Sequence, residues 1–342
     1  MVDKVKRDPF FDIVKFIAMF MVIYSHVVFY RPGFDLVAMP SYAMNFILVV
    51  NMPLFFMVSG CLSRRLHESR DWLKLVNRLV RYFWPLMVFS CVFAVYECIA
   101  GHLYSFSGIS LCCLKKFLFC HWFFFVLAVC DVITFLIWKN GTRDCTKVLL
   151  GVMVFCVCLA SSGRVLYATK IVAMIPFYWI GLVFLPKILS SRRMVMLVVV
   201  CLGLSIIIFS TYFFGNIATN GLSFYWDWLD IWHPSKDKII RMIERFVIGG
   251  VGCLSIMCAL KLIVENIPST AIFAILGTET LGIYLFQGNV IKCFSNRIVS
   301  LDAGPLEVLI ASLAVFAVCF VLVKGIKINK FIKSCAFGRN LF

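Results

Sequence analysis

The first apolar segment of this chain carries three ionisable side chains, Asp12, Lys15 and His26. Lys15 and His26 are eleven residues apart, which is about three turns of an α-helix, so a helix places both on one face. Asp12 and Lys15 are three residues apart and can form an ion pair on that face. With Met19 and Val22 they make a stripe, which we expect to face the interior of a helix bundle because charge in lipid is costly.

Proton transfer is the chemistry that suits this stripe, because histidine is the side chain that most readily gains and loses a proton near neutral pH. His26 is therefore the candidate acid or base, and Lys15 lies about 16 Å from it along the helix axis. A structural interpretation stays open. In it, His26 hydrogen-bonds to a neighbouring helix and the ion pair only orients the first span.

A second candidate site lies in the basic segment 63–81. Arg78 and Arg81 are three residues apart and share a helix face, and Arg64 and Arg65 precede them. The guanidinium fork matches the geometry of phosphate oxygens, so this segment is suited to a phosphate-bearing ligand. The alternative is the ordinary excess of basic residues on the cytoplasmic side of a membrane, in contact with lipid phosphates.

The composition places both candidate sites in an integral membrane protein. Hydrophobic residues make up 62% of the 342 residues, charged residues 15%, and the mean hydropathy is +0.97. Soluble proteins are typically about 45–50% apolar and about 25% charged, so a soluble enzyme is excluded. We interpret the net charge of +16 as cytoplasmic basic residues and expect no nucleic-acid partner. The 16 cysteines include no paired CxxC motifs, so we expect no metal site and interpret most cysteines as small apolar residues.

Hydropathy predicts an all-α bundle of about ten transmembrane helices, because a bilayer core about 30 Å thick needs about 20 apolar residues per helix. With a cytoplasmic N-terminus, most of the 33 Lys and Arg residues fall on the cytoplasmic side, which then also holds the C-terminus. Segment 63–81 is a cytoplasmic connection in this topology, and the residues between the third and fourth spans are external. We expect one multi-pass domain over residues 1–342. The predicted spans are approximately 10–30, 43–62, 82–100, 118–138, 147–162, 171–189, 194–212, 246–263, 271–291 and 306–323.

Several short motifs follow one another along the chain. Asp12-x-x-Lys15 and the following His26 open the series. Later motifs are MPLFFMVSG at 52–60, Arg78-x-x-Arg81 before Pro85, His121-Trp122-Phe123, an F-x-x-x-G at 177–181, and GTETLGIYL at 277–285. In type and order they resemble the motifs of the membrane-bound acyltransferase 3 family, and the resemblance extends over roughly residues 8–290.

The resemblance implies a membrane enzyme that transfers an acyl group, usually acetyl from cytoplasmic acetyl-CoA, to a hydroxyl of a lipid-linked or surface glycan. It implies a catalytic set of His26, Lys15 and Asp12, with His26 as general base and the other two orienting the helix or binding the pantetheine and phosphate end of the donor. It also implies acyl-CoA as co-substrate without a permanently bound cofactor. The family is common in bacteria, which suggests the inner membrane. Donor binding is implied for Arg78, Arg81, Arg64 and Arg65, and acceptor or secondary polar contacts for Glu279, Thr280, Gln287, His121 and Trp122.

Two positions depart from the family's late motif. Thr280 stands where serine is common, and Gln287 stands where histidine is common. Gln287 cannot act as an acid or base, so any role for it is a neutral hydrogen bond. A proton-coupled transporter or exporter of a small solute or glycan precursor is the alternative function, since intramembrane Asp, Lys and His also form proton relays. Against it, the chain shows no matched pair of Gly- or Pro-interrupted spans.

Overall fold

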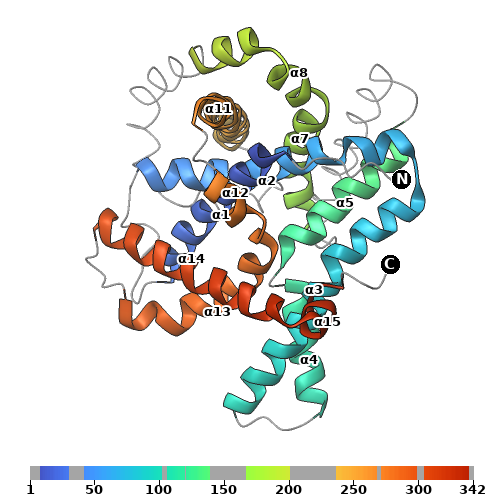
Figure 1. Ribbon diagram of the computed structural model, residues 1–342, viewed down its shortest axis with the longest axis vertical. Coiled ribbons are helices and arrows are strands. Elements are labelled where there is room, and N and C mark those ends of the chain that lie inside the picture. Colours follow the sequence, from blue (N-terminus) through green and yellow to red (C-terminus); the bar gives the residue numbers. More distant parts are fainter. Residues whose placement is uncertain are drawn as a thin grey trace. The chain divides into compact units, whose positions relative to one another are not determined.

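The computed structural model describes residues 8–30, 42–101, 106–119, 121–138, 167–200, 236–267, 271–298 and 304–338. All regular secondary structure in these ranges is helical, which confirms the all-α prediction. The helices labelled in Figure 1 are α1 (Pro9–Phe29), α2 (Tyr42–Ser69), α3 (Trp72–Ala100), α4 (Phe106–Phe119), α5 (Trp122–Ile137), α7 (Ala168–Val183), α8 (Leu185–Leu189), α11 (Lys236–Asn266), α12 (Ala271–Gly277), α13 (Thr280–Ile298), α14 (Pro305–Ile328) and α15 (Lys330–Phe337). Residues 192–200 are helical as well.

Contacts between residues divide the chain into two compact units. The first unit comprises Met1–Leu62 and Pro176–Val321 and contains α1, α8, α11, α12 and α13. The second unit comprises Ser63–Ile175 and Leu322–Phe342 and contains α3, α4, α5 and α15. Helices α2, α7 and α14 contribute to both units. The candidate base and the basic segment therefore belong to different units.

Five helices in the described ranges are long and apolar enough to cross a membrane, so the chain is a multi-pass membrane protein. They are Pro9–Phe29, Phe46–Ser69, Trp72–Ile99, Phe246–Asn266 and Pro305–Ile328. Helices α4 and α5 together form a sixth candidate, with a bend of 57° between them. The predicted span 147–162 and most of 194–212 lie outside the described residues. The total of ten spans and the cytoplasmic termini stay predictions.

The basic segment 63–81, expected as a connection between spans, is helical almost throughout. α2 continues into it because Arg64 pairs with Glu68 one turn further on, with 2.7 Å between Nε and Oε1. The next helix begins after Asp71, whose side chain accepts from two backbone N–H groups of the first turn of α3. A two-residue turn separates the helices, with Arg70 at φ 50°. The arginines of this segment are therefore held on helices.

In the first unit, α1 contacts α11, α12 and α13 (Figure 1). It begins where the side chain of Asp8 accepts from the N–H of Phe10 at 2.9 Å, and a proline occupies the first helical position, where no N–H is needed. Asp12, Met19 and Val22 are at most 3% exposed. The polar stripe predicted from helical spacing therefore faces the interior of this unit.

Helices α2 and α7 approach each other through two glycines of the first unit. A Cβ atom at Gly60 would lie 1.9 Å from the carbonyl oxygen of Tyr178, and one at Gly181 would lie 1.9 Å from the carbonyl oxygen of Met57. Any larger residue at either position would push the backbones apart. Close backbone approach through small residues is typical of helix pairs in membranes, where packing replaces the hydrophobic effect.

In the second unit, α3 contacts α4, α5 and α15. The indole N–H of Trp84 donates to the carbonyl of Cys335 at 2.8 Å, and the ring of Phe89 lies 5.9 Å from that of Phe337. These contacts fix α15 along α3. α15 thus packs against α3, the helix that carries the basic residues Arg78 and Arg81.

Candidate active site

His26 lies in the last turn of α1, where its carbonyl accepts from the N–H of Tyr30 at 3.0 Å. The side chain is partly buried, and its Nδ1 atom is buried without a hydrogen-bond partner among the described residues. The ring of Tyr30 stands edge-on, with 6.3 Å between the centroids. The neighbouring Ser25 hydroxyl donates to the carbonyl of Val22 at 2.8 Å and is thus committed to its own helix. The exposed part of the imidazole is therefore not its Nδ1 edge.

Gln287 is the polar side chain that faces His26. It is 3% exposed and lies on α13 beside the imidazole. Its Oε1 atom, like Nδ1 of His26, is buried and has no hydrogen-bond partner within the described ranges. A ring N–H donor and an amide oxygen are chemically complementary. The residue that departs from the family motif therefore lies beside the candidate base.

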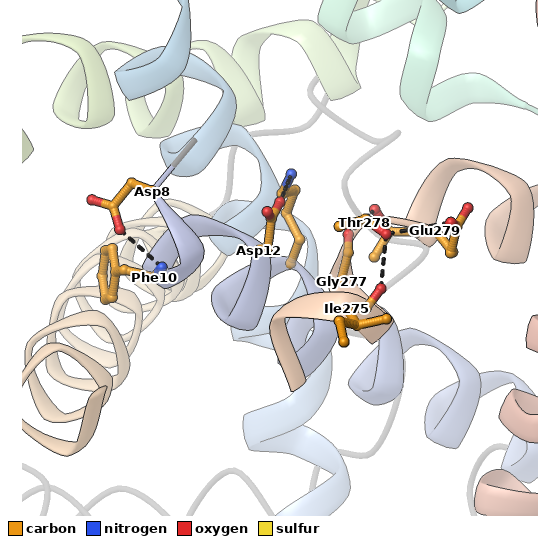
Figure 2. A network of polar contacts seen from close by, with 9 residues as sticks. Asp8, Phe10, Asp12, Ile275, Gly277, Thr278 and Glu279 are labelled. Atoms are coloured by element: carbon orange, nitrogen blue, oxygen red, sulfur yellow. Dashed lines mark hydrogen bonds and ion pairs between the residues drawn. The ribbon is translucent and has the colours of Figure 1, made fainter. Parts of the chain in front are cut away.

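Asp12 and Lys15 form the ion pair expected from their spacing, with 2.6 Å between Oδ1 and Nζ. The side chain of Asp12 is 4% exposed and that of Lys15 is 22% exposed, so the ammonium group balances the charge of a buried carboxylate. Figure 2 shows Asp12 beside the turn that joins α12 to α13. A Cβ atom at Gly277 would lie 1.7 Å from the carbonyl oxygen of Asp12, so the two backbones are in direct contact.

The expected continuous span 271–291 is interrupted between α12 and α13. The hydroxyl of Thr278 donates to a backbone carbonyl of α12 at 2.8 Å and also contacts Oε1 of Glu279 at 3.3 Å (Figure 2). Thr280 donates to the carbonyl of Gly277 at 3.2 Å. These hydroxyls add hydrogen bonds to backbone carbonyls at the break. Glu279, 5% exposed, thus places a carboxylate at the break.

The contacts at Gly277 and Gln287 show that α1 and α13 lie side by side and run in the same direction. Asp12 precedes His26 by about 21 Å along α1, and their neighbours Gly277 and Gln287 follow in the same order on α12 and α13. The ion pair therefore marks one end of this helix contact and the His26–Gln287 pair marks the other. Direct proton transfer between the two pairs is excluded by this distance.

Arg78 is paired inside the second unit. Its Nε atom lies 2.8 Å from Oδ2 of Asp131, a carboxylate on α5 with no exposed surface. The hydroxyl of Tyr82 donates to the same oxygen at 3.1 Å, and the guanidinium carbon lies 5.7 Å from the centre of the Tyr82 ring. A buried carboxylate is tolerated when it is paired and hydrogen-bonded in this way. The Nε edge of Arg78 is therefore used to hold α3 against α5.

Asp131 and Tyr82 are site residues that sequence reasoning missed. A carboxylate inside the predicted span 118–138 was the available signal, because an ionisable group in lipid needs an interior partner. The identity of that partner could not be read from the sequence, since Arg78 and Asp131 are 53 residues apart.

Arg81 and Arg65 carry exposed side chains, and within the described ranges neither makes an ion pair or a hydrogen bond. Arg64, 46% exposed, is engaged by the carboxylate of Glu68. The second unit thus separates two kinds of arginine. Arg78 is tied to an internal carboxylate, whereas Arg65 and Arg81 present their charge to the surroundings.

His121 and Trp122 lie at the entry to α5. His121 is 8% exposed. The ring of Trp122 is covered by the ammonium group of Lys170, which lies 4.4 Å from its centroid and 5.3 Å from that of Tyr167. This cation–π contact stabilises the meeting point of α5 and α7 within the second unit.

A comparison with protein families matches residues 8–324 to the acyltransferase domain of one family. The chain belongs to the acyltransferase 3 family. The matched range contains His26, Gln287 and the arginines of the basic segment, and it confirms the resemblance expected from the short motifs. The curated proteins and the solved structures contain no significant match to the chain.

Membership in the acyltransferase 3 family makes the protein an enzyme that uses an acyl donor as co-substrate. Its apolar helices make it a multi-pass membrane acyltransferase. Within that frame, the His26–Gln287 pair is an interior arrangement suited to acid–base chemistry, and the exposed arginines are suited to an anionic ligand.

Proposed function

We propose that this acyltransferase moves an acyl group, acetyl in the first instance, from cytoplasmic acyl-CoA to a hydroxyl of a lipid-linked or surface glycan, with His26 as general base. The observation that carries the proposal is the position of Gln287 beside His26, with a buried Nδ1 and a buried Oε1 awaiting a partner. A fixed partner on one ring nitrogen determines which nitrogen carries the proton and which can accept one. A catalytic base has this requirement, because only a nitrogen that carries no proton can accept one.

The reaction follows from this tautomer. Oε1 of Gln287 accepts the Nδ1–H of His26, which leaves the lone pair on Nε2. Nε2 removes the proton of the acceptor hydroxyl while the hydroxyl oxygen attacks the thioester carbonyl. The C–S bond then breaks, and the CoA sulfur takes the proton from the imidazolium. An ester and the CoA thiol are formed, and His26 is again neutral. General-base catalysis of this kind contributes about 10²–10⁴-fold to the rate.

The donor contacts are assigned to the basic helices of the second unit. CoA carries several phosphate charges, and the exposed guanidinium groups of Arg81 and Arg65 suit them, with Arg64 as a further contact. Arg78 has a different part in this proposal, because its Nε edge is already bonded to Asp131. It holds the helix that carries Arg81 in place.

In the first unit, the proposed acceptor contact is the break between α12 and α13. The carboxylate of Glu279 is a hydrogen-bond acceptor for sugar hydroxyls, whereas the hydroxyl of Thr280 maintains the break itself. His121 and Trp122 are proposed acceptor contacts in the second unit. A bacterial inner membrane is the proposed location, since it offers acyl-CoA on one side and surface glycans on the other.

Acceptor-dependent thiol release tests the proposed function. The purified full-length protein is incubated with acetyl-CoA, or with succinyl-CoA in parallel, and with a panel of surface glycans and lipid-linked sugars. We expect thiol release that depends on one acceptor class, together with an alkali-labile ester on that acceptor in the mass spectrum. Acyl transfer to amines alone, or thiol release that no hydroxyl acceptor stimulates, contradicts the proposal.

A further inference from the structure

Helices α3 and α4 of the second unit are joined by a cluster of cysteine and charged side chains. Sγ of Cys91 lies 3.1 Å from Sγ of Cys113. Next to this pair, Lys116 lies 2.7 Å from Oε1 of Glu97, and the thiol of Cys112 donates to the same carboxylate at 4.0 Å. Most of the 16 cysteines were interpreted from the sequence as small apolar residues. This pairing could not be predicted, because the two thiols meet only when the helices pack.

We propose that Cys91 and Cys113 form a disulfide that cross-links α3 to α4. A disulfide bond is about 2.05 Å long, so the two sulfurs need to approach by about 1 Å, which small changes in the χ1 angles provide. Both thiols are at least partly accessible, Cys91 being exposed and Cys113 intermediate. This inference is independent of the proposed acyl donor and acceptor.

Cys113 reaches the pair from the segment that the predicted topology places on the external side, where disulfides form and persist. Cys91 lies within the third predicted span, so Cys113 is the thiol that an external oxidant meets first. Metal binding is the other common use of clustered cysteines. Within the described ranges, however, no group of three or more metal-ligating side chains occurs. A cross-link therefore suits the pair better than a metal site.

The oxidant is a disulfide of an external thiol–disulfide oxidoreductase. The thiolate of one cysteine attacks that disulfide, forms a mixed disulfide and releases one thiol of the oxidant. The thiolate of the second cysteine then attacks the sulfur of the first, which closes the Cys91–Cys113 bond and releases the second thiol. The acyltransferase loses two protons and two electrons. The oxidant takes them up, and its disulfide is reduced to two thiols.

The competing pairing is between Cys98 and Cys112, which belong to the same two helices. Cys98 is 3% exposed, so it is poorly accessible to an oxidant. The thiol of Cys112 is directed to the carboxylate of Glu97. These two cysteines therefore serve as the matched control.

Thiol mapping of the wild-type protein tests the cross-link. Cells are lysed in N-ethylmaleimide, and the full-length protein is purified and digested without reductant for mass spectrometry. We expect a linked peptide that contains Cys91 and Cys113, with both thiols alkylated only after reduction, whereas Cys112 is alkylated at once. Alkylation of Cys91 and Cys113 in the unreduced protein, or linkage of either to another cysteine, overturns the proposal.

Thermal unfolding with and without dithiothreitol gives a second measurement. We expect reduction to lower the melting temperature of the wild-type protein by about 5–10 °C, because the cross-link restricts the unfolded chain. The double variant C91A/C113A loses this response, and C98A/C112A keeps it. A response that persists in C91A/C113A, or disappears in C98A/C112A, overturns the proposal.

Discussion

Gln287 on α13 lies beside His26 on α1, and each side chain buries one polar atom that has no hydrogen-bond partner among the described residues. The two residues come from opposite ends of the matched family domain. Gln287, which departs from the family motif, is therefore a neighbour of the candidate base. Gln287 is thus a positioning residue in the proposed mechanism.

Replacing Gln287 with leucine should lower kcat about 10–100-fold, because the imidazole loses the acceptor that fixes its tautomer. The KM for acyl-CoA should change little. Gln287→His should retain activity, since a second imidazole can also accept the Nδ1–H. Asn289→Leu is the matched control. Asn289 lies two residues after Gln287, and the helical rotation places it on the opposite face of α13. Equal activity of Gln287→Leu and the control refutes the positioning role.

Gly277→Ala should destabilise the protein by about 1–3 kcal/mol or more, because the added methyl group would lie 1.7 Å from the carbonyl oxygen of Asp12. Gly288→Ala on α13 is the control. A Cβ atom there meets no heavy atom within 4 Å, so the variant should match the parent or gain slightly in stability. Thermal melts followed by size exclusion measure both variants. A Gly277→Ala protein as stable as the Gly288→Ala protein is incompatible with the direct contact of α1 and α12.

Asp131→Ala should destabilise the protein by about 3–5 kcal/mol, because it leaves the partly buried Arg78 guanidinium without its carboxylate. Glu68→Ala removes the partner of Arg64 in an ion pair whose two side chains are 46% and 48% exposed, and it should cost about 0–1 kcal/mol. Melting temperatures compare the two variants directly. Similar melting temperatures count against a structural role for the Arg78–Asp131 pair.

Arg81→Ala should raise the KM for acyl-CoA about tenfold without changing the melting temperature, because an exposed guanidinium is lost that contacts a CoA phosphate in the proposal. Arg81→Lys keeps the charge but loses the fork, so its KM should rise less. The difference between Arg81→Ala and the parent should shrink as salt concentration rises. An unchanged KM in low salt would mean that Arg81 takes no part in donor binding.

The features predicted correctly from the sequence are those that depend on local periodicity. Hydropathy predicted the five long apolar helices found in the described ranges, and the spacing of Asp12 and Lys15 predicted both their ion pair and the buried face of α1. These inferences need only the pitch of one helix and the cost of charge in lipid.

The features that escaped prediction depend on packing between distant segments. The Gln287–His26 and Asp131–Arg78 pairs each join helices that a single sequence cannot place together. The break after Gly277 has the same origin, since a glycine in an apolar run signals nothing until a second backbone lies against it. The helical course of segment 63–81 was predicted only in part. Arg78 and Arg81 were placed on a helix face, whereas the segment as a whole was interpreted as a connection between spans, although Arg64 and Glu68 are spaced to stabilise a helix.

Replacement of His26 tests the account most directly. Thiol release and ester formation are compared for the parent and His26→Ala, with melting temperature and size exclusion as controls for folding. The account predicts a loss of about 10²–10⁴-fold in kcat with a folded protein, and partial recovery when imidazole is added to the assay. Full activity of a folded His26→Ala protein would contradict the assignment of the base.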